Sequence, residues 1–437
     1  MRFEEYNISP EIKKNLSKLS FKRPTDIQFK SIPSILKGED VLAIAQTGTG
    51  KTAAFAIPVI NMIDEKKRIK RPDGIKCLVM VPTHELAIQL MEVFTKLSRH
   101  TRVTTYGIYG GVDQDPQIEK LNKGVDILIA TPGRMFDLRS QGHLILDRVE
   151  ILILDEADHM LDLGFIGDIQ DLMRHLPKKR QTLFFSATIN QKIKKLAYSL
   201  VTNAIRIQIS PKNPVAKNVN HKVIFVSMDD KRFFLERIVN ENSESKILVF
   251  VRTKVRAERV KKAMGRVAIE SITIHGDKDQ RDRNLVMNQF KSGEVKLLIA
   301  TDVSARGIDI PDVDIVINYD LPDKDENYVH RVGRTARADS TGVALTLITP
   351  RDQRNFGEIE SLIGSEVKKL QLPEELGEGP KYNPNAPKES RYGRNRGGGG
   401  RYNNNRGRNS NSRRGGGNRN SNQRDSRSKP RSPSKHD

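Results

Sequence analysis

The sequence predicts an α/β fold with two parallel-sheet domains joined by a short linker. Short apolar runs alternate with longer helix-compatible segments, and this alternation stops once and then resumes. Such alternation is typical of parallel sheets covered by helices. The break is a polar stretch interrupted by two prolines. We therefore expect a first domain at residues 1–208, a linker at 209–219, a second domain at 220–375 and a tail at 376–437.

Each expected strand is a short, almost wholly apolar run, as in strands buried on both faces of a sheet. In the first domain these runs are residues 41–44, 77–81, 126–130, 151–154 and 182–185. In the second domain they are residues 223–226, 247–251, 271–274, 296–299, 315–317 and 343–348. The carboxyl ends of such strands form the edge where ligands bind, so the residues that follow each run are the first candidates for a site.

The first strand is followed by a glycine-rich turn, a Gly-Lys-Thr sequence and a helix-compatible stretch, which is the context of a phosphate-binding loop. The nucleotide-binding residues predicted here are Ala45, Gln46, Thr47, Gly48, Thr49, Gly50, Lys51 and Thr52. Backbone N–H groups of the loop would approach phosphate oxygens, and Lys51 would reach the terminal phosphates. The hydroxyl of Thr52 would hold Mg²⁺. Ala45 departs from the usual pattern, which begins with glycine.

The strand at residues 151–154 ends abruptly in an acidic segment that contains Asp155, Glu156 and Asp158. Asp155 is the natural partner of the Mg²⁺ near Thr52, in part through water, and Glu156 would polarise the water that attacks the γ-phosphate. The two segments together predict an ATPase. A guanine nucleotide is disfavoured, because no Asn-Lys-x-Asp sequence follows.

Composition indicates the setting of the protein. One cysteine, Cys77, excludes an intrachain disulfide and suits a reducing compartment. No apolar run approaches the roughly 20 residues of a membrane span, and the N-terminus lacks the basic-then-apolar order of a signal peptide. We expect a cytoplasmic protein with no membrane partner.

The tail carries most of the basic charge. Of the formal charge of +21, residues 381–437 contribute +13, from 12 Arg and 4 Lys against 3 acidic residues. Arg, Gly, Asn and Ser dominate this segment, tyrosines are interspersed, and Leu, Ile, Val, Met and Phe are absent. We expect it to be disordered and to bind nucleic acid through phosphate contacts and base stacking, although a purely solubilising tail is the alternative.

The ordered motifs over roughly residues 3–350 resemble those of DEAD-box ATP-dependent RNA helicases, in which alanine at the position of Ala45 is usual. The compact core and the basic tail resemble the bacterial RhlE type. The resemblance implies two tandem RecA-like domains with a disordered basic tail, ATP and Mg²⁺ as cofactors, and RNA, single-stranded and duplex, as the partner. The subtype suggests ribosomal particles or the RNA-decay machinery as further partners.

The resemblance also implies roles for individual residues. Phe21 would stack on adenine, Gln28 would bond its edge and Asp309 would meet the ribose. Arg334 and Arg337 would be arginine fingers, which stabilise transition-state charge. The residues that would couple the ATP and RNA sites are Asp158, Ser186, Thr188, Asp302 and His330. The residues that would contact RNA are Pro82, Thr83, Gly110, Gly111, Thr131, Pro132, Gly133, Arg134, Arg252, Gln280, Arg283 and Thr301.

The chain departs from the family's commonest pattern at a few positions. Ser20 stands where glycine is usual, His159 follows the acidic motif where arginine is frequent, and Ala336 replaces a glycine between the two fingers. His84 matters most, because it replaces an arginine near the expected RNA path and removes a permanent charge.

Three functions of different classes compete. The first is an RNA helicase that binds the RNA backbone between its two domains and couples ATP hydrolysis to local unwinding or remodelling of RNA–protein particles. The second is a DNA translocase of the same architecture. The third is an RNA chaperone that acts mainly through its basic tail. RNA-stimulated ATP hydrolysis separates the first from the others, and the ordered motifs favour it.

Overall fold

The structure is a computed structural model, which describes residues 2–46, 48–67, 74–209, 218–302, 310, 313–335, 341–364, 367–372 and 380–381. All of these residues belong to the first of two compact units of the chain. Apart from Pro380 and Lys381, the predicted tail at residues 376–437 lies outside the described residues. Within the described part of the chain, no helix is both long and apolar enough to cross a membrane.

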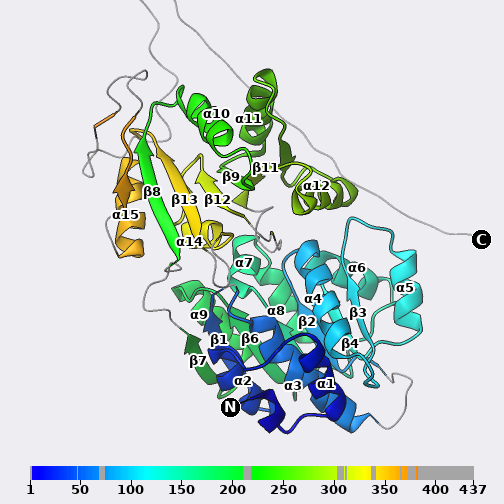
Figure 1. Cartoon of the computed structure of the whole chain (residues 1–437). Helices are drawn as coiled ribbons and strands as arrows, with labels where there is room; N and C mark the ends of the chain where they lie inside the picture. The colour runs from blue at the N-terminus through cyan, green and yellow to red at the C-terminus, as the bar shows by residue number, and fades with distance from the viewer. Residues whose placement is uncertain are drawn as a thin grey trace, which may run out of the picture. The chain divides into compact units, whose positions relative to one another are not determined.

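The first lobe is a seven-stranded sheet of order β3-β4-β2-β5-β6-β1-β7, in which every pairing is parallel (Figure 1). Its strands are β1 Val41–Ala45, β2 Cys77–Met80, β3 Thr105–Ile108, β4 Ile127–Ala130, β5 Ile151–Leu154, β6 Gln181–Ser186 and β7 Ile205–Ile209. Its helices are η1 Phe3–Glu5, α1 Pro10–Lys18, α2 Asp26–Leu36, α3 Lys51–Lys66, α4 His84–Leu97, α5 Asp115–Asn122, α6 Pro132–Ser140, α7 Ala157–Asp162, α8 Ile166–His175 and α9 Gln191–Leu200.

The second lobe repeats this topology. Its sheet has the order β10-β11-β9-β12-β13-β8-β14, which is the first order with each strand number raised by seven. Its strands are β8 Val219–Phe225, β9 Ile247–Val251, β10 Ile272–Ile274, β11 Leu297–Thr301, β12 Ile315–Asn318, β13 Gly342–Ile348 and β14 Lys368–Lys369. Its helices are α10 Lys231–Glu241, α11 Lys254–Arg266, α12 Gln280–Ser292, α14 Asp325–Val332 and α15 Gln353–Ile363. The fold is therefore two tandem RecA-like domains, as the sequence predicts.

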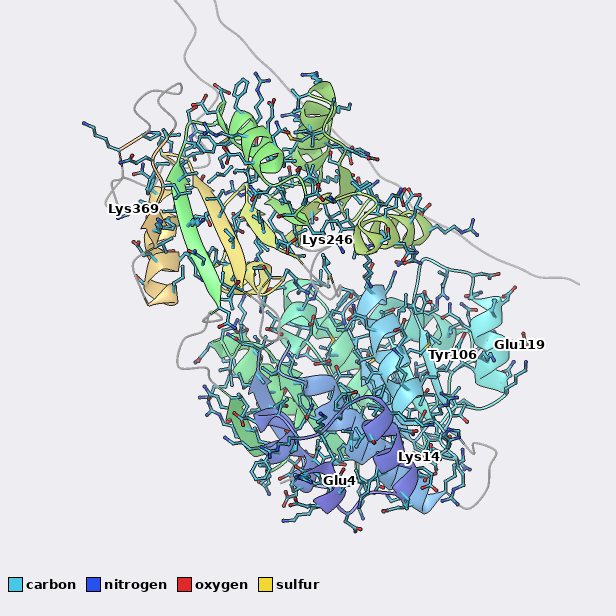
Figure 2. All side chains as sticks on the ribbon, in the orientation of Figure 1. Glu4, Lys14, Tyr106, Glu119, Lys246 and Lys369 are labelled. Atoms are coloured by element: carbon cyan, nitrogen blue, oxygen red, sulfur yellow. The ribbon has the colours of Figure 1, made fainter. Side chains whose placement is uncertain are left out.

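Both faces of each sheet are covered, which explains the apolar runs. Val41 and Ala43 of β1 belong to the core beneath α1 to α4, whereas Leu42 and Ile44 belong to the core beneath α6 to α9. Adjacent residues of a strand point to opposite faces, so a strand buried on both sides must be apolar throughout. Charged side chains lie on the covering elements, for example the exposed Glu4, Lys14 and Glu119 (Figure 2).

The strands that the sequence did not predict, β3, β7 and β14, lie at the edges of the two sheets. The burial of β7 shows why: Ile205 and Arg206 are exposed while Ile207 is buried, so no apolar run marks it. In β14, both lysines are exposed, and charge on an edge strand opposes pairing with other chains. The predicted linker 209–219 needs correcting at both ends, because Ile209 closes β7 and Val219 opens β8.

A partly buried histidine, His221, predicts that acid destabilises the second lobe. The Nδ1 atom of His221 in β8 lies 2.8 Å from the hydroxyl of Tyr328, and burial lowers the pKa of His221 to about 4. An unfolded histidine titrates near ~6.5, so protonation favours unfolding. The contribution of His221 to stability is therefore complete above pH ~6.5 and is lost as the pH falls toward 4.

Urea unfolding at several pH values measures this effect. Between pH 7 and pH 5 the unfolding free energy should fall by on the order of 1 kcal/mol more in the parent protein than in a His221→Asn variant, after allowance for partial exposure. Equal slopes in the two proteins would show that His221 does not contribute.

Candidate nucleotide site and RNA-facing edges

Two glycines of the loop after β1 have backbone conformations that favour glycine. Gly48 and Gly50 have φ values of +82° and +89°, in the left-handed region that favours glycine. A Cβ at Gly50 would also lie 2.5 Å from Nε2 of Gln28. Lys51 follows as the first residue of α3 and is 7% exposed. Thr47 lies outside the described residues.

The segment before α2 is tied to this loop. Gln28 is 2% exposed; its Nε2 donates to the carbonyl of Gly50 at 3.1 Å, and its Oε1 accepts from the backbone N–H of Thr25 at 3.0 Å. The Thr25 hydroxyl donates to the carbonyl of Thr49 at 2.8 Å. In this structure the side chain of Gln28 therefore binds the backbone of the loop, and its bond to adenine stays a prediction. Phe21, the predicted stacking residue, packs edge-on against Phe3 with ring centroids 6.0 Å apart.

Strand order brings the acidic segment beside the loop. β6 lies between β5 and β1, so the carboxyl ends of these three strands are neighbours although their residues are far apart in sequence. Asp155 follows β5 and is 3% exposed. Burial raises the pKa of Asp155 to about 6, with Glu156 and Asp158 acting in the same direction and the charge of Lys51 opposing them. A cation beside Asp155 would therefore stabilise its ionised form.

Glu156 has an unusual backbone and a strongly ionised side chain. Its φ of +50° is left-handed, a conformation that costs non-glycine residues about 1–3 kcal/mol and is common at functional sites. Burial alone would raise the pKa of Glu156, but a 3.3 Å hydrogen bond with His159 and the charges of Lys51 and Arg334 outweigh burial and lower this pKa to about 2. Glu156 is therefore a carboxylate at neutral pH, able to accept a hydrogen bond from water.

The residues present fit Mg²⁺ bound together with a nucleotide. Within the described part of the chain, Nζ of Lys51 is buried without a hydrogen-bond partner, which leaves an ammonium available for phosphate. The described residues also hold no group of three or more His, Cys, Asp or Glu side chains able to bind a metal alone. The buried carboxylate of Asp155 and the hydroxyl of Thr52 are oxygen ligands that suit Mg²⁺ together with water and phosphate oxygens.

The predicted coupling residues meet beside this site. Oδ2 of Asp158 accepts from the backbone N–H and the hydroxyl of Thr188, at 3.1 and 3.2 Å. The Ser186 hydroxyl donates to the carbonyl of Thr188 at 2.7 Å. Asp158, Thr188 and His330 line one cavity together with Lys324 of the second lobe. The structure therefore brings Asp158, Ser186, Thr188 and His330 together.

Sequence reasoning gave no role to Arg331, although it lies between His330 and Arg334. It is 2% exposed, and its guanidinium binds Asp302 through two hydrogen bonds, at 2.5 and 2.8 Å. It also donates to the side chain of Asn318 at 3.1 Å and to the carbonyl of Asp320 at 2.6 Å. Asp302, a predicted coupling residue, is thus held by Arg331.

Arg334 is buried, at 6% exposure, and its charge helps to lower the pKa of Glu156 in the other lobe. The second predicted finger, Arg337, and the predicted ribose contact, Asp309, lie outside the described residues, so the structure does not place them.

The predicted RNA contacts occupy the other half of each sheet edge. In the first lobe they follow β2, β3 and β4, the strands on one side of β5. In the second lobe they follow or end the equivalent strands β9, β10 and β11. In the first lobe the carboxyl edge is therefore divided between predicted RNA residues and predicted ATP or coupling residues. In the second lobe Asp302, a predicted coupling residue directly after β11, lies among the strands of the RNA half.

Several predicted RNA contacts have protein partners here. A hydrogen bond of 3.1 Å joins Nδ1 of His84 to Oε1 of Gln280, and an ion pair of 2.6 Å joins Arg283 to Glu85. Arg252 pairs with acidic side chains of its own lobe, at 3.4 and 3.5 Å. RNA would have to compete with these partners.

Comparison with known proteins identifies the family. Residues 25–196 match the model of DEAD/DEAH box helicases, and residues 230–339 match that of the helicase conserved C-terminal domain. The chain is 38% identical to the DEAD-box ATP-dependent RNA helicase RhpA of Helicobacter pylori over 376 residues, which are 85% of this chain and 74% of that protein. It is also 38% identical to CshA of Geobacillus kaustophilus over 371 residues, 85% and 78% of the two chains.

Solved structures agree with these matches. The chain resembles S. cerevisiae Dbp5 bound to RNA and ADP BeF3, with a TM-score of 0.76 and 28% identity, over 84% of this chain and 95% of that one. It resembles the DEAD-box helicase Mss116 bound to ssRNA and UDP-BeF with a TM-score of 0.77 and 28% identity, over 86% and 80% of the two chains. The chain therefore belongs to the DEAD-box ATP-dependent RNA helicase family, whose members are ATP-hydrolysing RNA helicases.

Proposed function

We propose that this helicase couples ATP hydrolysis to local unwinding of RNA duplexes or to remodelling of RNA–protein particles. The observation that supports the proposal is the strand order that the two sheets share. The residues predicted to contact RNA follow or end one set of three neighbouring strands in each sheet, and most residues predicted for ATP chemistry follow the other strands. The similar structures bound to RNA and a nucleotide analogue support the same ligands for this chain. The proposed domains are residues 1–209 and 219–375, which are the predicted bounds moved by one residue to include the ends of β7 and β8.

In the proposed reaction the first lobe binds ATP and the second completes the site. Backbone N–H groups of residues 45–50 and the ammonium of Lys51 hold the phosphates, and Glu156 accepts a hydrogen bond from the attacking water. Asp155 and Thr52 would hold Mg²⁺, which neutralises charge on the phosphate oxygens when it is bound. Arg334 meets the negative charge that develops in the transition state. Asp158 and Thr188 couple the nucleotide state of this site to the cavity that His330 lines.

RNA would be held by its backbone and not read by its bases. The residues proposed to contact it are mostly glycine, proline, threonine and arginine at strand ends, which suit phosphate and ribose contacts. Binding one strand across both lobes would bend it and release its partner. The RhlE subtype remains a prediction, because the relatives named above carry other names. The ribosomal or RNA-decay partners and the cytoplasmic location also remain predictions. No observation favours a chaperone acting through the tail.

Strand separation of a short RNA duplex with a single-stranded extension tests the proposal. We expect separation to require ATP and to exceed that of a DNA duplex of equal sequence. Separation at the same rate without ATP would support the chaperone, and a preference for DNA would support the translocase.

A variant of Arg134 tests the RNA-facing edge of the first lobe. Its Nη2 donates to the carbonyl of Val112 at 2.8 Å at the start of α6. Arg134→Ala should weaken single-stranded RNA binding roughly tenfold and reduce the log–log salt slope by about 0.7, the value for one phosphate contact. The KM for ATP should stay unchanged. Arg139→Ala is the matched control, because Arg139 lies in the last turn of the same helix and pairs with His175. Equal RNA affinity in the two variants would show that Arg134 does not contact RNA.

A further inference from the structure

The repeated topology gives the second lobe a counterpart of Lys51, a nucleotide-site residue. Lys51 begins α3, six residues after the last residue of β1; Lys231 begins α10, six residues after the last residue of β8. The two strands hold the same place in their sheets. β12 likewise takes the place of β5; Asp155 is the first residue after β5, whereas Asp320 is the second residue after β12. Lys231 therefore stands where Lys51 stands in the first lobe, and Asp320 lies one residue beyond the counterpart of Asp155.

The two lysines differ in their partners. Lys231 is 0% exposed; its Nζ donates to the carbonyl of Tyr319 and lies 3.6 Å from Oδ1 of Asp320 and 5.4 Å from the centre of the Tyr319 ring. Asp320 also accepts from Arg256 at 3.3 Å. A buried charge is tolerated when it is paired and hydrogen-bonded in this way. In the second lobe Lys231, the counterpart of Lys51, is therefore paired with Asp320, an acidic side chain of the protein itself.

The Tyr319–Asp320 turn is held from two sides. Lys231 contacts it from α10, and Arg331 of α14 donates to the carbonyl of Asp320 at 2.6 Å. Arg331 also binds Asp302 and is stacked over the ring of Phe250 at 5.0 Å. Arg334 lies three residues after Arg331. A shift of the turn would therefore move the segment that carries Arg334.

We propose that Lys231 is a positioning residue for ATP hydrolysis, which acts by holding the Tyr319–Asp320 turn against Arg331 and so orienting Arg334. This inference rests on the proposed role of Arg334 as an arginine finger. Lys231 contacts neither nucleotide nor RNA in this scheme. Its removal should slow the chemical step and spare the binding of both ligands, because Arg334 acts mainly in the transition state.

Lys231→Met, which keeps most of the buried volume, tests the proposal. Steady-state ATP hydrolysis with saturating RNA, measured well below the thermal midpoint, should show kcat lowered about ten- to hundredfold, the scale of an ~1 Å misplacement. The KM for ATP and the half-saturating RNA concentration should change less than threefold. A variant with a lower thermal midpoint but kcat within twofold of the parent would overturn the proposal and leave Lys231 a purely structural role.

A double variant distinguishes an effect of Lys231 that acts through Arg334 from a purely structural role of Lys231. If Lys231 acts through Arg334, Lys231→Met combined with Arg334→Ala should be no slower than Arg334→Ala alone, whereas independent effects would multiply and contradict the inference. Full activity of Arg334→Ala alone would instead reject the proposed finger. Lys296→Met is the matched control, since Lys296 pairs with Glu244 at the surface at 2.7 Å. If Lys231→Met does not fold, it is replaced by the double variant Lys231→Met with Asp320→Asn, which lacks both charges of the pair. The same outcomes then support or contradict the proposal.

Discussion

Replacing Glu156 by glutamine is expected to lower kcat for RNA-stimulated ATP hydrolysis by about 10²- to 10⁴-fold, the usual contribution of a positioned acid or base. The physical reason is loss of the carboxylate, since Glu156 is ionised at neutral pH, with a pKa lowered to about 2, and glutamine cannot carry that charge. The KM for ATP should change less than threefold, because the phosphate loop is untouched.

Steady-state kinetics with a short single-stranded RNA measure this effect. Glu150→Gln is the matched control: Glu150 precedes β5, is exposed, and pairs with Lys66 at 2.9 Å and Lys76 at 3.7 Å. We expect the control to keep the parent kcat. If Glu156→Gln also kept it, the water would have to be activated by another group, and the assignment of Glu156 would be wrong.

Replacing Arg334 by alanine is expected to lower kcat by about 10³- to 10⁵-fold, the range found for arginine fingers in phosphoryl transfer. Arg334 is buried, and its positive charge acts on Glu156 across the two lobes. An arginine already held near the reacting groups needs little reorganisation when charge develops, so its removal should affect the transition state far more than ATP binding.

The measurement pairs kcat with nucleotide affinity. The dissociation constant for ATP in the presence of RNA should stay within about threefold of the parent value, because Arg334 contributes little to ATP binding in the ground state. Arg237→Ala in α10 is the control, because Arg237 is exposed and pairs with Glu241 at 2.6 Å. A large loss of ATP affinity without loss of kcat would place Arg334 in substrate binding.

Much of the fold follows from local signals. The central strands are apolar because both of their faces are buried, so β1, β2, β5 and β9 were predictable to within a residue or two. The edge strands β3, β7 and β14 carry no such signal, because one side of an edge strand meets solvent and tolerates polar residues. Their existence depends on pairing with a central strand that is distant in sequence. The fourth edge strand, β10, was predicted from its run at residues 271–274.

The candidate site also combines features that the sequence predicts with features that only the structure shows. The amino-acid sequence by itself determined the phosphate loop, the acidic segment and the order of the motifs, because each is a contiguous run whose chemistry is local. Only the tertiary structure decided that Gln28 bonds Gly50, that Arg331 holds Asp302, and that Lys231, the counterpart of Lys51, pairs with Asp320. These relations join residues from separate strands and helices, and strand order, which no local pattern encodes, brings them together.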